Sequence, residues 1–306
     1  MSRDARVDIV TDYFNVTGMK GKQGDWGVIF LNRPPLNILN REMCELLTKF
    51  LLSIRGTKEY QGLMIATELD HFSAGADIGE HLPGKVETML PAFHKLLLTV
   101  ADFPLPTVAV IKGSCQGGGL ELARACQYIV AADSGKVTIG VPETQLCCFP
   151  PYGVAAFPRY AGGRAEIVRH ILSGKTLKLD TAENITMAYK LGWVEECHVR
   201  PLSVREIASK LSFSAIEPYP TIKRRFANTA GFRKEFMTTI RDEEMAKVKP
   251  ERHNALKVAA QALLECSRFD TLAGALNLAE EMYFEQIKDD PNYINALTLF
   301  LERSKK

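Results

Sequence analysis

The sequence predicts an α/β fold, with an α/β core over residues 1–200 and a helical C-terminal region over residues 201–306. Two observations carry this prediction. Up to about residue 200, short apolar runs typical of buried strands alternate with segments whose apolar residues recur at helical spacing. Beyond that point the strand pattern fades, and helical periodicity continues almost to the C-terminus. Strands that alternate with helices in this way indicate βαβ units and a layered core.

The expected elements follow in order along the chain. A short apolar strand begins at Trp26 and ends at a pair of prolines. The segment 40–56 repeats its apolar residues at helical spacing up to Gly56, which predicts a helix. The other expected elements are a strand over 62–67, a helix over 86–103, a strand over 107–113, a helix from Glu121, a strand over 136–143, and helices over 206–213, 233–247, 253–266 and 272–287.

Composition and charge are those of an ordinary globular protein. The 306 residues are 46% hydrophobic and 24% charged, which allows a sizeable core. The net charge is +2 with both signs interspersed, so we expect neither nucleic acid nor a membrane surface as a partner. No apolar run reaches the ~18 residues of a membrane span, and the N-terminus lacks the apolar core of a signal peptide.

The seven cysteines are odd in number and show no CxxC or Cys/His spacing. We therefore expect reduced thiols in a cytoplasmic protein, and no metal site. Cys147 and Cys148 are adjacent, and no histidine neighbours them in sequence, which favours a packing role over thiolate chemistry.

Three predicted strands end in loops suited to chemistry: SAGAD (73–77), QGGGLE (116–121) and VPE (141–143). Ligands of layered α/β folds usually bind at strand ends. The glycines let backbone N–H groups face outward at a helix start, where the helix dipole favours developing negative charge. Amides from the first two loops could form an oxyanion hole, in which one donor is typically worth ~3 kcal/mol in the transition state. Glu121 and Glu143 could then act as a general acid and base.

Each motif also has a purely structural explanation. A glycine run before a helix permits close strand–helix packing. Glu121 in a first helical turn is favoured by the helix dipole, and Asp77 followed by Glu80 matches a capping box. Glu143 after a proline would ordinarily be a solvated carboxylate. Only the combination of motifs points to chemistry.

Four stretches, in this order, resemble the enoyl-CoA hydratase/isomerase (crotonase) superfamily: NRPPLNILN, SAGADIGEH, KGSCQGGGLELARACQYIVAAD and IGVPETQLCCFPPYG. The later segment ILSGKTLKLDTAENITMAYKLGWVEE is similar to a further part of that family. The resemblance covers about residues 26–200 and resumes at FLERSKK. It implies a crotonase-like spiral of ββα units with a helical C-terminal trimerisation region, acyl-CoA thioester ligands and an enolate-like intermediate.

The resemblance also implies roles for individual residues. The backbone N–H groups of Ala76 and Gly118 are expected to form the oxyanion hole, and Glu121 and Glu143 to be the catalytic pair. Phe300 and Lys305 are expected near a neighbouring subunit's CoA site. The expected substrate contacts are Leu36, Asn37, Ala74, Asp77, Ile78, Cys148, Pro151, Tyr152, Phe300 and Lys305.

Assembly is a further expectation. The helix over 272–287 carries apolar residues at helical spacing, more than one solvent-facing helix needs. These residues are Leu272, Leu276, Ala279 and Met282 or Tyr283. Together with the resemblance, they predict a homotrimer or a dimer of trimers.

The presence of both glutamates favours addition or removal of water, because most subclasses of the superfamily lack one of them. The stretch from EHLP (80–83) to DFPLP (102–106) is similar to members that hydrate alicyclic dienoyl-CoA thioesters. The resemblance therefore implies an acyl-CoA hydratase that adds water reversibly to cyclohexa-1,5-diene-1-carbonyl-CoA. CoA is part of this substrate, and no separate cofactor is expected.

Two departures from the family's pattern leave alternatives open. LCCFPPYGVAA (146–156) replaces a glycine-rich loop, and residues 215–260 exceed the usual linker. Within the latter, KPERHNALKVAAQAL (249–263) is similar to the hydratase part of multifunctional fatty-acid oxidation proteins. The alternatives are a straight-chain enoyl-CoA hydratase or isomerase, a ring-opening hydrolase of an oxo-cyclohexenyl-CoA and, from a different class, a catalytically silent acyl-CoA-binding subunit.

Overall fold

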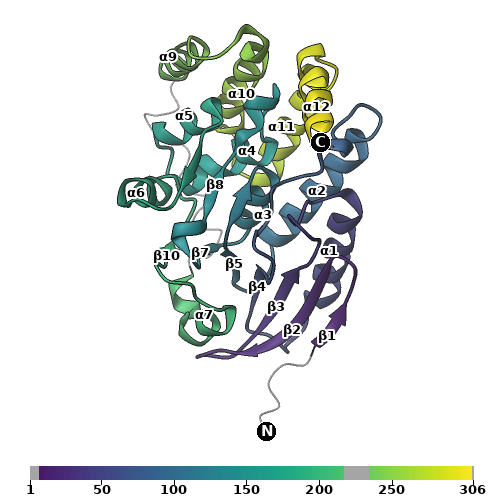
Figure 1. Ribbon diagram of the computed structural model, residues 1–306, viewed down its shortest axis with the longest axis vertical. Helices are drawn as coiled ribbons and strands as arrows, with labels where there is room; N and C mark the ends of the chain where they lie inside the picture. The colour runs from purple at the N-terminus through teal and green to yellow at the C-terminus, as the bar shows by residue number, and fades with distance from the viewer. Residues whose placement is uncertain (1–6, 217–233, 305–306) are drawn as a thin grey trace.

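The structure is a computed structural model that describes residues 7–216 and 234–304. Its main sheet has seven strands in the order β1-β2-β3-β4-β5-β7-β10 (Figure 1). From β3 onward, neighbouring strands run parallel, whereas β1, β2 and β3 pair antiparallel. The strands are β1 (Val7–Val10), β2 (Phe14–Lys20), β3 (Asp25–Leu31), β4 (Gly62–Thr67), β5 (Thr107–Ile111), β7 (Tyr128–Ala131) and β10 (Glu196–Cys197).

Successive residues of the parallel strands point to opposite faces of the main sheet, and both faces are buried. On one face, Met64 and Val108 pack with Ile207, from α7 (Val204–Lys210), in one apolar cluster. On the other face, Ile65 and Ala109 join the larger core. That core includes residues of α1 (Arg41–Ile54), α2 (Val86–Ala101) and α3 (Gly118–Ala125).

Several sequence predictions are confirmed. The helix expected over 40–56 is α1, and the Asn40 side chain caps it by accepting a hydrogen bond from the Met43 N–H at 3.1 Å. The strand expected over 62–67 is β4, and the helix expected over 86–103 is α2. The capping box expected at Asp77 is only half present. Asp77 caps a short 3₁₀ helix, whereas Glu80 accepts a hydrogen bond from the Arg41 N–H at 2.6 Å.

Several elements of the fold are not predicted from the sequence, and two of them differ most from the expected order. The first is the antiparallel edge formed by β1 and β2 before the first expected strand. The second is α4 (Pro151–Tyr160), within the segment that replaces the family's glycine-rich loop. Residues 151–159 are all buried, so this helix has no polar face and shows no amphipathic period.

A second, three-stranded sheet brings the chemical loops together. It consists of β6 (Ser114–Gln116), β8 (Thr138–Gly140) and β9 (Thr176–Lys178). Because β6 and β8 are parallel and Gln116 pairs with Gly140, the glycine run and the Glu143 segment leave the sheet at the same edge. A bridge between Ser73 and Cys115 adds the SAGAD loop to this edge.

The chain after β10 forms only helices in the described residues. They include α9 (Lys234–Met245), α10 (His253–Cys266), α11 (Leu272–Gln286) and α12 (Pro291–Arg303). Two further helices, α5 (Ala165–Ser173) and α6 (Ala182–Lys190), precede β10. Figure 1 shows α10, α11 and α12 next to α4 and α2 at one end of the molecule. The C-terminal helices thus share the core's hydrophobic cluster.

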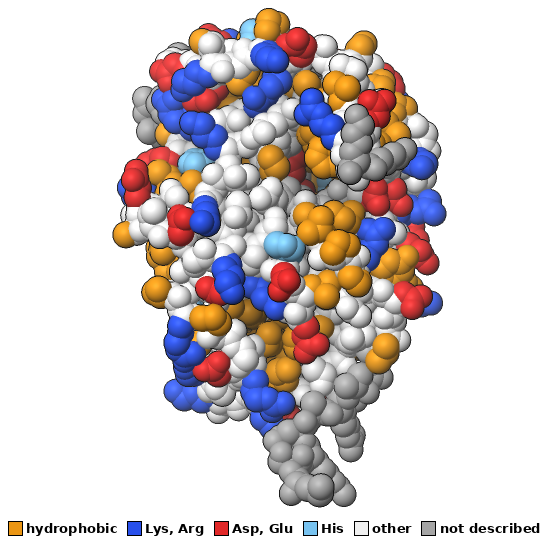
Figure 2. Space-filling model, in the orientation of Figure 1, with side chains coloured by type: hydrophobic (Ala, Val, Ile, Leu, Met, Phe, Trp, Pro, Cys, Tyr) orange, Lys and Arg blue, Asp and Glu red, His pale blue; other side chains and the backbone are white. Residues whose placement is uncertain are grey.

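The expectation that α11 presents its apolar residues to another subunit is wrong. Leu272, Leu276, Ala279, Met282 and Tyr283 are all buried within the chain. α11 lies against α4, α10 and α2, which cover that face. On the face shown in Figure 2, basic and acidic side chains are interspersed, as the sequence predicts.

Candidate active site

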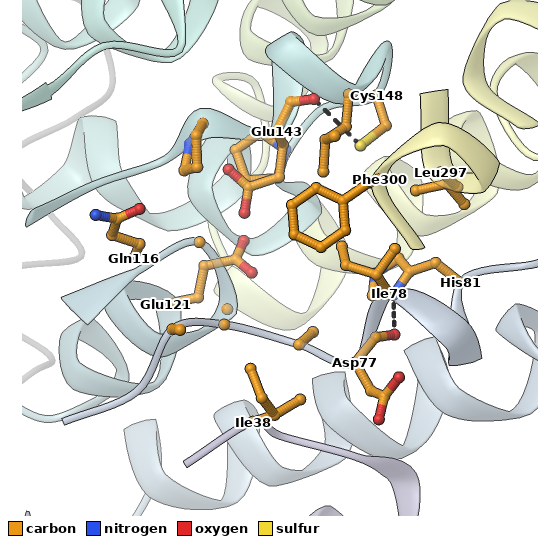
Figure 3. A pocket seen from close by; sticks show the side chains of 18 of the residues that line it. Ile38, Asp77, Ile78, His81, Gln116, Glu121, Glu143, Cys148, Leu297 and Phe300 are labelled. Atoms are coloured by element: carbon orange, nitrogen blue, oxygen red, sulfur yellow. Dashed lines mark hydrogen bonds between the residues drawn. The ribbon is translucent and has the colours of Figure 1, made fainter. Parts of the chain in front are cut away.

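The chemical loops surround a cavity of about 520 Å³, shown from close by in Figure 3. Its walls come from the SAGAD loop, the start of α3, the 3₁₀ helix η3 (Pro142–Leu146), the start of α4, and α12. Eleven of the residues proposed from the sequence line it: Leu36, Ala74, Ala76, Asp77, Ile78, Gly118, Glu121, Glu143, Cys148, Pro151 and Phe300.

Glu121 lies in the first turn of α3 and is only 3% exposed. Its Oε1 accepts a hydrogen bond from the Gly153 N–H, in α4, at 2.7 Å. Burial raises the pKa of Glu121 to about 7, although the amides of Gly153 and Tyr152 oppose this shift. The helix that the sequence does not predict therefore supplies the contact that orients this carboxyl group.

Glu143 lies in η3 and points into the same cavity (Figure 3). Its Oε2 is buried and has no hydrogen-bond partner within the described parts of the chain. Burial first, and the charge of Glu121 second, raise the pKa of Glu143 well above its usual range. The two carboxyl groups can therefore share a proton at neutral pH, as a proton donor and a proton acceptor require.

The three consecutive glycines meet three different neighbours. A β-carbon at Gly117 would lie 2.6 Å from Oε1 of Glu143, and one at Gly119 would lie 2.6 Å from the Ser73 carbonyl oxygen. A β-carbon at Gly118 would lie 3.1 Å from the Ala76 nitrogen. The run thus makes room for a carboxylate, for the SAGAD loop and for an amide.

The backbone N–H groups of Ala76 and Gly118 lie at the meeting point of two loops. The bridge between Leu39 and Ala76 uses the neighbouring Gly75 carbonyl and Asp77 N–H, and Gly118 is the first residue of α3. Neither amide donates a hydrogen bond to another group in residues 7–216 and 234–304. Two free donors beside one cavity, one at a helix N-terminus, suit an oxygen that gains negative charge.

The rest of the cavity is mainly apolar and includes residues that sequence reasoning missed. The missed residues include Ile38, Leu90, Phe93, Leu146, Tyr283, Leu297 and Leu301. Several come from helices far away in sequence, so no local motif could identify them. In Figure 3, Phe300 of α12 lies beside the glutamates.

His81 and Gln116 are further polar residues in the cavity wall that were not predicted. His81 Nδ1 lies 2.8 Å from the carbonyl oxygen of Asp77, so Nδ1 carries the proton in the neutral ring. Burial lowers the pKa of His81. A neutral imidazole is therefore favoured there.

Some of the proposed contacts do not line the cavity. Asn37 is fully buried, and its amide donates to Thr67 Oγ1 at 2.9 Å and to the His71 carbonyl at 3.0 Å, so it supports the loops from behind. The Tyr152 ring is also fully buried, and only its backbone acts on Glu121. Phe300 lines the cavity of its own chain, and Lys305 lies outside the described residues.

Within the described ranges, no three His, Cys, Asp or Glu side chains are grouped so that they could hold a metal ion. All seven cysteines are unpaired. The described helices include none that is both long and apolar enough to span a bilayer.

The chain is similar to known proteins in sequence. Residues 22–270 match the enoyl-CoA hydratase/isomerase family. A fatty acid oxidation complex subunit alpha from Vibrio campbellii is 33% identical over 178 residues, and the match covers 56% of this chain and 24% of that protein. A cyclohexa-1,5-dienecarbonyl-CoA hydratase from Thauera aromatica is 28% identical over 204 residues, covering 64% of this chain and 78% of that one.

A solved structure gives the same picture of the fold. An enoyl-CoA hydratase from Mycobacterium avium subsp. paratuberculosis superposes with a TM-score of 0.61 at 20% identity, over 96% of this chain and 97% of that one. At this identity the likeness concerns the fold alone. The crotonase-like fold with a helical C-terminal region is therefore confirmed.

Proposed function

The chain belongs to the enoyl-CoA hydratase/isomerase family, and we propose that it adds water reversibly to an alicyclic dienoyl-CoA, cyclohexa-1,5-diene-1-carbonyl-CoA. The observation that carries this proposal is the arrangement of Glu121 and Glu143 in one mainly apolar cavity that also holds the free amides of Ala76 and Gly118. An enzyme of hydratase type needs both parts. The amides stabilise charge on the thioester oxygen, and the carboxyl groups move the protons of water.

In the proposed reaction, the thioester oxygen accepts hydrogen bonds from the Ala76 and Gly118 N–H groups. Glu121 takes a proton from water while the water oxygen bonds to a carbon of the conjugated ring. The displaced electron pair moves through the ring to the thioester oxygen and forms an enolate. When the electrons return, a ring carbon takes a proton from Glu143, and proton exchange with solvent restores both carboxyl groups.

The assignment of roles follows from the surroundings of the two carboxyl groups. Glu143 is held neutral by burial and by the charge of Glu121, which suits the proton donor. Glu121 is oriented by the Gly153 amide, and this hydrogen bond opposes the rise of its pKa, which suits the acceptor.

The ring substrate is supported by the shape and chemistry of the wall. Ile78, Phe149 and Leu297 give it bulky apolar surface, and it has few polar groups to bind a polar chain. The relative from Thauera aromatica, whose name states this substrate, adds support. The proposed reaction calls for no metal, nucleotide or redox cofactor.

A straight-chain enoyl-CoA is the second candidate substrate. The fatty acid oxidation subunit from Vibrio campbellii is more similar, at 33% identity, although the match spans only 24% of that protein. Assembly as a homotrimer or a dimer of trimers stays a proposal that rests on the family alone, because the apolar face of α11 is covered within the chain.

Incubation with a panel of cyclic and linear acyl-CoA thioesters in isotopically labelled water tests the reaction type. A hydratase places one labelled oxygen in an alcohol and keeps the thioester intact. Label in a carboxylate would instead indicate a hydrolase. No reaction with any thioester would favour the catalytically silent subunit.

A further inference from the structure

Glu121 and Glu143 differ in how they are held. Oε1 of Glu121 accepts a hydrogen bond from the Gly153 N–H at 2.7 Å, whereas the buried Oε2 of Glu143 has no hydrogen-bond partner in the described residues. No side chain of the described residues therefore holds Oε2 of Glu143 by a hydrogen bond. Its position depends on the backbone of η3, which carries it.

η3 is short, and the hydrogen bonds at its C-terminal end are long. 3₁₀ helices are short and have poorer hydrogen-bond geometry than α-helices. The Cys147 N–H lies 3.4 Å from the Thr144 carbonyl oxygen, and the Cys148 N–H lies 3.3 Å from that of Glu143. These bonds are longer than the usual 2.7–3.2 Å, so contacts from outside η3 can add to its stability.

Arg252 makes such contacts at the residue next to Glu143. Its Nε donates to the Thr144 carbonyl oxygen at 2.8 Å, and its Nη2 donates to Thr144 Oγ1 at 3.3 Å and to the Ser173 carbonyl oxygen at 3.2 Å. Thr144 is fully buried. One guanidinium thus joins the backbone of η3 to the end of α5. The exposed side chain of Gln145 adds a bond to the Gly174 carbonyl at 2.6 Å.

Arg252 makes these contacts at an electrostatic cost. In the described parts of the chain, no carboxylate lies within ion-pair distance of its guanidinium, which is half-buried. Burial accordingly lowers the pKa of Arg252. The planar fork of an arginine can bind a carbonyl and a hydroxyl together, which the single ammonium of lysine cannot do in the same geometry.

The helix that follows Arg252, α10, is well packed in the core. Arg252 directly precedes α10, which packs through buried residues such as Ala255, Ala259 and Leu263 against α4, α5 and α11. α10 lies within the segment matched by the family, residues 22–270, and carries most of KPERHNALKVAAQAL (249–263).

We infer that Arg252 is a positioning residue for Glu143, through which the C-terminal helical region holds η3 and aims the carboxyl group into the cavity. The loss of turnover expected on replacing Arg252 rests on the proposed function. The displacement of the Glu143 carboxyl group expected on replacing Arg252 does not depend on that function. The C-terminal helical region therefore has a role in the active site of its own chain.

The first experiment compares Arg252→Ala with Arg169→Gln, using the thioester that the wild type hydrates fastest. Arg169 joins α5 to Glu243 of α9 at 2.6 Å, and within the described residues no hydrogen bond or ion pair links its guanidinium to η3, so it is a matched control from the same region. Arg252→Ala should lower kcat by up to about 10²-fold with little change in KM, because a displacement of about 1 Å has this effect. Arg169→Gln should retain kcat. Guanidinium ion, below unfolding concentrations, should restore part of the lost turnover, and sodium chloride at equal ionic strength should not.

The second experiment is a crystal structure of Arg252→Ala, which does not depend on activity. It should show Glu143 displaced and the bond from Gly153 to Glu121 intact. An unmoved Glu143, or an unchanged kcat in the folded variant, would overturn the inference. Should Arg252→Ala fail to fold, Arg252→Lys carries both tests, since it keeps the stem and the charge. If the wild type hydrates no thioester, the proposed function fails, and the crystal structure still decides the role of Arg252.

Discussion

The Cα of Gly117 faces the carboxylate of Glu143 so closely that a β-carbon at position 117 would lie 2.6 Å from Oε1 of Glu143. Gly117 also has a φ of 53°, which side chains rarely adopt. The carboxyl group and the turn therefore both need glycine at this position. The closeness also fixes how far Glu143 can approach the start of α3.

Gly117→Ala should lower turnover on the order of 10²-fold, because the methyl group displaces Glu143 from the reacting carbons. Gly135→Ala is the matched control, since a β-carbon there meets no atom within 4 Å. Steady-state kinetics of the two variants check this. Wild-type kcat in folded Gly117→Ala would show that the place of Glu143 is not critical.

Glu121→Gln and Glu143→Gln should each lower kcat by roughly 10²–10⁴-fold, the range of general acid–base groups. The loss of kcat in the double variant should be much smaller than the two single losses combined, because both carboxyl groups act on the protons of the same water molecule. Glu166→Gln is the control, a carboxyl group in the first turn of α5 that does not line the cavity. Near-normal turnover in either single variant, with the fold intact, removes that residue from the mechanism.

The raised carboxyl pKa values predict a dependence of stability on pH. Between its unfolded value near 4.5 and its folded value of about 7, Glu121 binds more protons in the folded protein than in the unfolded chain. The free energy of unfolding should therefore fall as the pH rises through this window. Denaturant titrations at several pH values measure this slope.

Glu121→Gln supplies the control for the pH dependence, because a neutral amide replaces the titrating group. The slope between pH 4.5 and about 7 should be shallower in Glu121→Gln than in the wild type. An equal slope in both proteins would mean that Glu121 ionises normally in the folded state.

A crystal structure with a bound acyl-CoA tests the proposed oxyanion hole. The thioester oxygen should lie about 2.7–3.1 Å from the nitrogens of both Ala76 and Gly118. A thioester bound with its oxygen elsewhere, while the acyl group fills the cavity, would contradict the assignment.

The local parts of the fold could be predicted because they depend on patterns within one segment. Asn40 caps α1, and the alternation of strands and helices up to β8 follows the apolar periodicity. The α4 helix escaped prediction because it is buried on all sides and contains Pro158, so it has neither a polar face nor an uninterrupted helical sequence.

The site could be predicted only where its residues lie in contiguous motifs. Glu121, Ala76 and Gly118 belong to the two loops that β6 brings together, and parallel pairing of β6 with β8 adds Glu143. The apolar part of the cavity wall could not be predicted, because residues such as Tyr283 and Leu297 reach it from C-terminal helices. The apolar residues of α11 suggest contact with another subunit, whereas helices of the same chain cover them. Periodicity shows that a helix face is covered, but not what covers it.

The measurement that tests the central proposal most directly is kcat/KM for cyclohexa-1,5-diene-1-carbonyl-CoA and crotonyl-CoA, determined side by side on the wild type. A flexible linear chain should fill the apolar cavity loosely and lose orientation relative to Glu121 and Glu143. We predict that kcat/KM for the cyclic diene is at least about tenfold higher. If crotonyl-CoA is hydrated as well as the cyclic diene, the ring specificity is wrong, and hydration of straight-chain thioesters takes its place.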